Sequence, residues 1–333
     1  DETKQAGGLL LLFGFYFVSD DLTTATPTQV GMPFLKDSVM IEALLMGGGG
    51  KGKGTWGQAT PGSTSKANAR AVTLDDQVYV FGGYNGTSYA ADFRCYDPST
   101  DSWINKAGGP PARHYHLMAA AAGKICVYGG SGSGGTLSDL WVYDPIANTW
   151  ASKTGAGGRK EAAVAAIGNK IYFCSGVTSS AVTPILNCYD IVTNTWTTLQ
   201  PLPVLRYRSA MSAVGTKLYL YGGGNNTEPR FKEHWCYDTL TDTWTQLPDG
   251  PDARNSHTSV ELGGKILVFG GSRASGHGDD LWSYDPVTNE WSGLKNGLIA
   301  RTVHYAAAAQ GKMFVGGGQS QAGFENTLHK YTP

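Results

Sequence analysis

A unit of about 47 residues recurs along the chain, and this repeat constrains the fold more strongly than any other feature of the sequence. Each unit is marked by a pair of glycines, by a tyrosine and by a tryptophan seven residues after the tyrosine. The tyrosines are Tyr96, Tyr143, Tyr189, Tyr237, Tyr284 and Tyr331. The tryptophans are Trp103, Trp150, Trp196, Trp244 and Trp291. The glycine pairs are residues 82–83, 129–130, 222–223, 270–271 and 317–318, with Ser175-Gly176 in the third unit. Such a period predicts an array of units that bury a core only by packing on one another.

Each unit contains four short segments with the pattern of β-strands. In the fourth unit an apolar stretch at residues 209–214 leads through a glycine turn into the β-rich run 217–221. A long loop, a third strand at residues 234–238 and a fourth at residues 243–247 complete the unit. In units such as the first and fifth, Asp-Pro at the turn before the fourth strand supplies a capping side chain and a fixed φ. Six such units predict an all-β fold, a six-bladed β-propeller.

The paired glycines, the tyrosine and the tryptophan spaced after it, over residues 55–333, resemble the kelch repeat. This resemblance implies a propeller, a fold that hosts both binding modules and enzymes. The third unit departs from the motif at Ser175, and the sixth lacks both the aspartate and the tryptophan.

Trp56 stands apart from the first complete unit, yet it lies one period of 47 residues before Trp103. The sixth unit ends at Pro333, before its fourth strand. We therefore expect the strand around Trp56 to complete the last blade and close the ring, which removes an exposed sheet edge.

Composition and charge exclude several classes of protein. The formal net charge of −1 provides no general attraction to nucleic acid or to anionic membranes. The five cysteines form no C-x-x-C pair, so a zinc site is not expected, and reduced thiols fit synthesis in the cytoplasm. The histidines that share one position in the repeat, His116, His257 and His304, lie on separate blades and are not expected to hold a metal. No cofactor is predicted.

One face of the propeller is the expected binding face. It carries the loops between second and third strands, which differ from unit to unit as a binding surface can and a scaffold cannot. The point where each first strand begins lies on the same face. There, at one position of the repeat, the residues are Asn68, Tyr115, Glu161, Arg208, Ser256 and Val303. In kelch proteins that bind peptides, arginines at this position take acidic groups of the ligand, and Arg208 matches. Our candidate ligand-binding residues are Tyr115, Glu161, Arg208, Asn225, Arg230 and Arg273.

A basic residue stands sixteen positions before each glycine pair. These residues are Lys66, Arg113, Arg159, Arg206, Arg254 and Arg301. Two interpretations are open: a ring of positive charge that attracts anions to the mouth, or side chains that bond the carbonyls or carboxylates of a neighbouring blade.

Two functions are compatible with the repeat. The first is a non-enzymatic binding module that recognises a protein or a surface glycan. The alternative is a propeller enzyme that acts on a sugar at the central mouth, but no set of acid, base and metal ligands shares a suitable loop. We expect no enzymatic activity.

Residues 1–54 lie outside the repeat. The apolar run at residues 7–18 is too short to span a bilayer, and its acidic start and the lack of a small-residue cleavage site argue against a signal peptide. We expect residues 1–46 to anchor the chain to a partner subunit or host assembly, with residues 47–54 as a glycine-rich linker. Residues 38–54 resemble glycine-rich segments of phage tail-fibre proteins, which implies a fibre or virion as that assembly.

Overall fold

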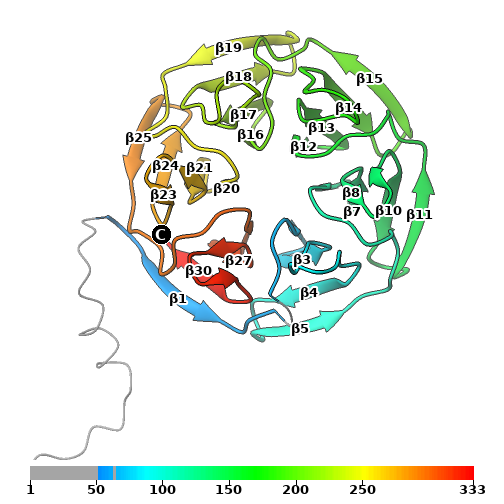
Figure 1. The fold of residues 1–333 in the computed structure, drawn as a ribbon, viewed down its shortest axis with the longest axis horizontal. Coiled ribbons are helices and arrows are strands. Elements are labelled where there is room, and N and C mark those ends of the chain that lie inside the picture. The colour runs from blue at the N-terminus through cyan, green and yellow to red at the C-terminus, as the bar shows by residue number, and fades with distance from the viewer. Residues whose placement is uncertain (1–51, 63–64) are drawn as a thin grey trace, which may run out of the picture. The chain divides into compact units, whose positions relative to one another are not determined.

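Six four-stranded antiparallel sheets stand around a central axis in the part of the chain that the computed structural model describes, residues 52–62 and 65–333 (Figure 1). This arrangement confirms the all-β, six-bladed propeller that the repeat predicts. The expected anchor at residues 1–46 and most of the linker at residues 47–54 lie outside the described residues, as does nearly all of the stretch that resembles tail-fibre segments.

The first three blades follow the order of the chain, from the innermost strand to the outermost. Blade 1 is β2 (Arg70–Leu74), β3 (Gln77–Phe81), β4 (Phe93–Asp97) and β5 (Ser102–Asn105). Blade 2 is β6 (Leu117–Ala121), β7 (Lys124–Tyr128), β10 (Leu140–Asp144) and β11 (Thr149–Lys153). Blade 3 is β12 (Ala163–Ile167), β13 (Lys170–Cys174), β14 (Leu186–Asp190) and β15 (Thr195–Leu199).

The remaining blades repeat this order, except that the last one borrows its outer strand from the start of the propeller. Blade 4 is β16 (Ala210–Val214), β17 (Lys217–Tyr221), β18 (His234–Asp238) and β19 (Thr243–Leu247). Blade 5 is β20 (Thr258–Leu262), β21 (Lys265–Phe269), β24 (Leu281–Asp285) and β25 (Glu290–Gly293). Blade 6 is β26 (Tyr305–Ala309), β27 (Lys312–Gly316), β30 (Leu328–Thr332) and β1 (Thr55–Ala59).

Three loops between second and third strands form small two-stranded ribbons. These are β8 with β9 (Ser131–Gly132, Gly135–Thr136), β22 with β23 (Ser272–Arg273, Gly276–His277) and β28 with β29 (Gln319–Ser320, Gly323–Phe324).

Burial along each blade explains its sequence pattern. Second strands such as β3 and β7 are apolar and buried almost throughout, because neighbouring blades cover both of their faces. Outer strands such as β5 and β11 are largely exposed and correspondingly polar. The cores lie between blades: one cluster joins Tyr172 and Leu186 of blade 3 to Leu218 and Trp235 of blade 4. No blade could bury these residues alone.

The strand around Trp56 closes the ring as predicted. β1 pairs antiparallel with β30, with Trp56 opposite Tyr331, and Figure 1 shows β1 on the outer edge of the sheet near the C-terminus. Trp56 is 7% exposed, and its indole nitrogen donates to the carbonyl oxygen of Lys295 at 2.8 Å. Trp103 donates in the same way to the carbonyl of Thr60 at 2.9 Å. In both cases the acceptor follows the outer strand of the preceding blade. Trp56 therefore links blade 6 to blade 5, just as Trp103 links blade 1 to blade 6.

The ring of basic residues forms part of the scaffold rather than an anion-attracting surface. Arg113 is fully buried, donates to the carbonyl of Gly129 at 2.9 Å and makes two bonds of 2.7 Å to the Asp139 carboxylate. Both acceptors belong to blade 2, the blade of Arg113 itself, and not to a neighbouring blade as one interpretation held. The link to the neighbour is made by the backbone, since the carbonyl of Arg113 accepts from the Gly83 amide at 2.9 Å.

That backbone contact explains the paired glycines. Gly83 has φ of 111°, and a side chain at Gly82 would place Cβ 2.6 Å from the carbonyl oxygen of Arg113. Ser175, which replaces a glycine in blade 3, has φ of 61° and donates its hydroxyl to the carbonyls of Arg206 and Thr183. The departure of the third unit from the motif is thus accommodated by a polar side chain that bonds the neighbouring blade.

Candidate binding site at the propeller mouth

A ring of six residues surrounds the axis at the end of the propeller that carries the long loops, and backbone hydrogen bonds join its members everywhere except between Tyr115 and Asn68. The six residues that form it occupy the repeat position two residues after the basic one, and all have left-handed φ between 49° and 57°. The amide of Arg208 donates to the carbonyl of Glu161 at 2.8 Å, and that of Glu161 to Tyr115 at 3.1 Å. The ring continues through the amides of Ser256, Val303 and Asn68. The backbone here is therefore part of the scaffold, while the six side chains are free to differ.

Above this ring lies a cavity of about 540 Å³, here called the mouth. Five of the six blades contribute to it, through the ring residues and through the loops between second and third strands. Its lining includes Asn68, Tyr84, His114, Tyr115, Arg208, Arg230, Ser256, Val303 and Phe324. A second cavity of about 130 Å³, here called the chamber, shares Asn68, Tyr115, Arg208, Ser256 and Val303 with the mouth. The two cavities are therefore neighbours along the axis, separated by the ring.

Arg208, one of the candidate ligand-binding residues, lines both the mouth and the chamber. Its guanidinium forms an ion pair with Glu161, with contacts of 2.8 and 3.2 Å, and donates to the Tyr115 hydroxyl at 3.3 Å. It also stacks over the Tyr115 ring, 5.2 Å from the centroid. Burial disfavours the charge of Arg208, but the bonds to Glu161 outweigh it and raise the arginine pKa. These contacts hold the guanidinium, still charged, at the wall of both cavities.

Glu161 lies behind Arg208 rather than at the surface. It is 7% exposed and lines neither the mouth nor the chamber. Its role in the geometry is to position Arg208, so a direct contact between Glu161 and a ligand stays a prediction without support from the cavity lining.

The side of the mouth formed by blades 6, 1 and 2 is aromatic. Tyr84 lies 6.2 Å from Phe324 and 5.7 Å from His114, measured between ring centroids, and His114 lies 4.4 Å from Tyr115. Burial lowers the pKa of His114 to about 4, so its ring is neutral at pH 7. The sequence analysis did not identify Tyr84, His114 or Phe324. The sequence could have indicated Tyr84 and Phe324, because both stand on the variable loops of the expected binding face.

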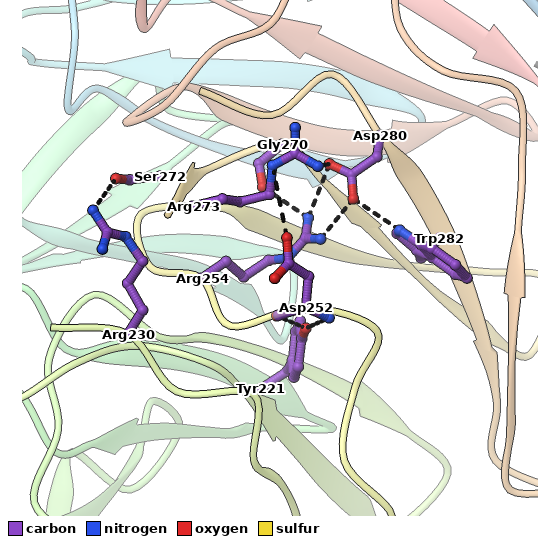
Figure 2. Close-up of polar contacts among 9 residues, drawn as sticks. All are labelled: Tyr221, Arg230, Asp252, Arg254, Gly270, Ser272, Arg273, Asp280 and Trp282. Carbon is purple, nitrogen blue, oxygen red and sulfur yellow. Dashed lines mark hydrogen bonds and ion pairs between the residues drawn. The ribbon is translucent and has the colours of Figure 1, made fainter. Parts of the chain in front are cut away.

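Arg230 and Arg273 have different environments, although both lie on these loops (Figure 2). Arg230 lines the mouth and makes one long contact, 3.5 Å, to the Ser272 hydroxyl. Arg273 lies 3.4 Å from the Asp280 carboxylate and 3.9 Å from Asp252, and it lines neither cavity. The structure thus brings Arg230 together with Arg208 and Tyr115 around one cavity, and leaves Arg273 in an ion-pair network at its periphery.

Asn225 shapes its loop. Its side-chain oxygen accepts from the amides of Thr227 and Glu228 at 3.0 and 2.7 Å, and Asn85 in blade 1 makes the same pattern with Thr87 and Ser88. This is the hydrogen bonding of an Asx turn. The carbonyl of Asn225 contacts the Tyr207 hydroxyl at 3.3 Å, and the residue lines neither cavity.

Two further features concern residues 52–62 and 65–333: groups of side chains that could hold a metal ion, and helices that could cross a membrane. In these segments no three His, Cys, Asp or Glu side chains gather closely enough to hold a metal ion. They also contain no helix of the length and apolar character that crossing a membrane demands. All five cysteines are buried and free of disulfides.

Comparison with known families gives a match over the whole described propeller. A family model described as the KLHDC2/KLHL20/DRC7 Kelch-repeats domain matches residues 53–203 and, in a second placement, residues 161–333. The two placements overlap in blade 3, and together they cover residues 53–333.

Proposed function

The chain belongs to the kelch-repeat family, and from this premise we propose that it is a non-enzymatic binding module whose mouth holds a segment of a protein ligand. Kelch propellers commonly serve as protein-interaction modules. The observation that carries the proposal is the composition of the mouth: its side chains are specific to individual blades, although they stand on a backbone that repeats in every blade.

The chemistry of the mouth favours a ligand with an acidic group beside an apolar one. Arg208 and Arg230 offer guanidinium donors on one side, and Tyr84 and Phe324 offer aromatic faces on the other. Charge-assisted hydrogen bonds contribute about 1.5–3 kcal/mol each. The enzyme alternative finds little support in this arrangement, because Glu161 is bound by Arg208 and lies outside the cavity lining.

A surface glycan is a second candidate ligand. The observation that favours it is the same aromatic side, since the flat faces of Tyr84 and Phe324 can pack against sugar rings. The experiment that separates the two is an array of proteins and glycans, probed with the intact chain and with Tyr84→Ala. Specific binding to a protein that is lost in the variant supports the main proposal, and a chain that binds nothing on either array contradicts it.

The expected anchor at residues 1–46 belongs to the same proposal. An exposed apolar run such as residues 9–18 would promote aggregation of a free monomer, so a partner subunit or host assembly, of which a virion fibre is one example, is proposed to cover it. Light scattering of the intact chain should give an assembly, whereas a chain that begins at Gly54 should be monomeric. An intact chain that stays monomeric without detergent contradicts the anchor.

A further inference from the structure

The chamber below the mouth carries a positive charge that has no counterpart in its lining. Its walls are formed by the innermost strands of the blades and by the ring residues. The lining contains two arginines, Arg70 and Arg208, and no aspartate or glutamate. The charge of Arg208 is balanced from behind by Glu161. The charge of Arg70 is the one that remains.

Arg70 is not part of the repeating scaffold. It is the first residue of β2, and the residues at the same position in blades 2 to 6 are Leu117, Ala163, Ala210, Thr258 and Tyr305. An arginine at this position is therefore a property of blade 1 alone, unlike the basic ring that every blade contains.

The guanidinium of Arg70 is fixed at one nitrogen and free at the other two. Its Nε donates to the carbonyl of His116 at 3.1 Å. Its two terminal nitrogens make no hydrogen bond, and no carboxylate lies within ion-pair distance, among the residues that the structure describes. By contrast, Arg113, Arg206 and Arg254 each have a carboxylate at 2.6–2.7 Å.

Ser209 also lines the chamber, but its hydroxyl oxygen is buried away from the cavity surface and makes no hydrogen bond within the described part of the chain. The two chamber histidines add no charge, since burial lowers the pKa of His257 to about 3 and that of His304 well below its usual value. Arg70 is attracted at longer range by Glu161, but that carboxylate is already paired with Arg208. The partial burial of the Arg70 charge costs free energy, which an anion in the chamber would offset.

We propose that the chamber binds a compact oxyanion, held by the free edge of the Arg70 guanidinium with Arg208 on the same chamber wall. The volume of about 130 Å³ is roughly ten times what one water needs, so a phosphate, sulfate or carboxylate group fits with some water. Burial lowers the pKa of Arg70, but an arginine keeps its charge at neutral pH. The site deepens the proposed function and rests on it only where the anion belongs to a ligand in the mouth, because the chamber adjoins both the mouth and a further cavity lined by the innermost strands.

The oxyanion has two sources: a free ion, or the anionic group of a larger ligand whose remainder occupies the mouth. Two probes distinguish them. Inorganic phosphate represents the free ion, and phenyl phosphate adds an aromatic ring that can reach the side formed by Tyr84 and Phe324. Similar affinity for the two probes indicates a free ion. Phenyl phosphate that binds about tenfold more tightly, with the gain lost in Phe324→Ala, indicates an attached group.

The test is isothermal titration of the full chain with each probe at constant ionic strength. We expect saturable binding at one site, weakened about tenfold or more in Arg70→Gln. The matched control is Arg94→Gln, an arginine on β4 of the same blade that contacts Asn105 and Trp103 and lines neither cavity. Arg70→Lys, which keeps the charge, should recover part of the affinity.

Two results would overturn the proposal: no saturable binding of either probe to the intact chain, or equal affinity in the intact chain and in Arg70→Gln. A melting temperature measured for each variant shows whether it is folded, and Arg70→Lys serves in place of Arg70→Gln if the latter is not. These titrations use no macromolecular ligand. The titrations can therefore contradict the oxyanion site while the array still finds a binding partner. Equally, they can support the oxyanion site while the array finds no partner.

Discussion

Replacing Trp56 by alanine should destabilise the whole propeller, because this residue closes the ring. The change removes a large buried side chain that packs on Phe269 and Tyr331, with ring centroids 5.2 and 5.3 Å away. It also removes the bond from the indole nitrogen to the Lys295 carbonyl. Replacing a buried tryptophan by alanine costs about 3–5 kcal/mol, and the loss of an indole hydrogen bond together with the near-complete burial of Trp56 places this change in the upper half of that range. We therefore expect a loss of about 4–5 kcal/mol in the free energy of unfolding.

Thermal unfolding followed by tryptophan fluorescence or calorimetry measures this loss. In a domain of this size 1 kcal/mol shifts the melting temperature by about 2 °C, so Trp56→Ala should melt about 8–10 °C lower. Trp150→Ala, which removes the equivalent indole bond to Ala107, should cost no more, because Trp150 is only partly buried. Gln58→Ala, an exposed position on the same strand, is the control and should change stability by less than about 0.5 kcal/mol. A Trp56→Ala chain that melts with the Gln58→Ala control would refute closure by β1.

Three further changes test the scaffold. Asp139→Asn leaves the buried Arg113 guanidinium without its counter-charge and should cost about 3 kcal/mol in urea unfolding, whereas Asp144→Asn, in an exposed pair with Lys124, should cost clearly less. Gly130→Ala forces Cβ to 2.8 Å from a carbonyl at φ of 95° and should destabilise clearly, while Gly108→Ala, with open space around it, should be neutral or slightly stabilising. Stability should fall as the pH drops from about 6.5 to 4, because the unfolded chain takes up protons on histidines that the folded chain keeps neutral. A urea midpoint that stays constant over this range would contradict the neutral burial of these side chains: His116, His234, His257 and His304.

The fold could be predicted from the sequence because the same residue types make the same packing and hydrogen-bond contacts at the same position of successive blades. Tyr237, for example, is buried and donates its hydroxyl to Asp242, and Tyr143 does the same to Asn148. A residue that every blade needs recurs at the repeat period. Where such a residue is missing from a unit, another part of the chain is expected to supply it. The missing fourth strand of the sixth unit and the isolated Trp56 thus predicted β1 correctly.

The basic ring shows the limit of the same reasoning. Its period left open whether the side chains face the solvent or the scaffold, since both arrangements repeat in every blade. In the structure Arg113 reaches the carbonyl of Gly129, the first glycine of its own pair, a contact that the constant spacing does not by itself indicate. Periodicity gives the position of a residue in a blade but not the direction of its side chain.

The lining of the mouth was only partly predictable, because it consists of the positions where the residue differs from blade to blade. Arg208, Tyr115 and Arg230 were selected for that difference and line the mouth together. Arg273 was chosen on the same ground, but Asp252 and Asp280 engage it, and no spacing in the sequence indicates that contact. The sequence analysis did not select Arg70, because it lies within a predicted strand. A charged residue in a strand is expected to face solvent, and only the structure shows that this one lines the chamber.

Glu161 is buried and paired with Arg208, so substitutions of Arg208 affect stability as well as ligand binding. Arg208→Ala would leave a buried carboxylate without its partner, so a lower melting temperature is expected along with any loss of affinity. Arg230→Ala and Phe324→Ala remove mouth side chains with few supporting contacts and are the cleaner variants.

The central claim is that ligand binds at the mouth and not at the turns on the opposite face. Its most direct test is the affinity of the chain for its strongest partner from the array, measured by biolayer interferometry alongside the melting temperature of each variant. Arg230→Ala and Phe324→Ala should each weaken binding about tenfold or more without lowering the melting temperature. Ser99→Ala and Thr193→Ala, in the turns before the outer strands of blades 1 and 3, should bind like the unmodified chain. Equal losses from the two pairs, or a loss confined to the turn variants, would contradict the assignment of the mouth as the binding site.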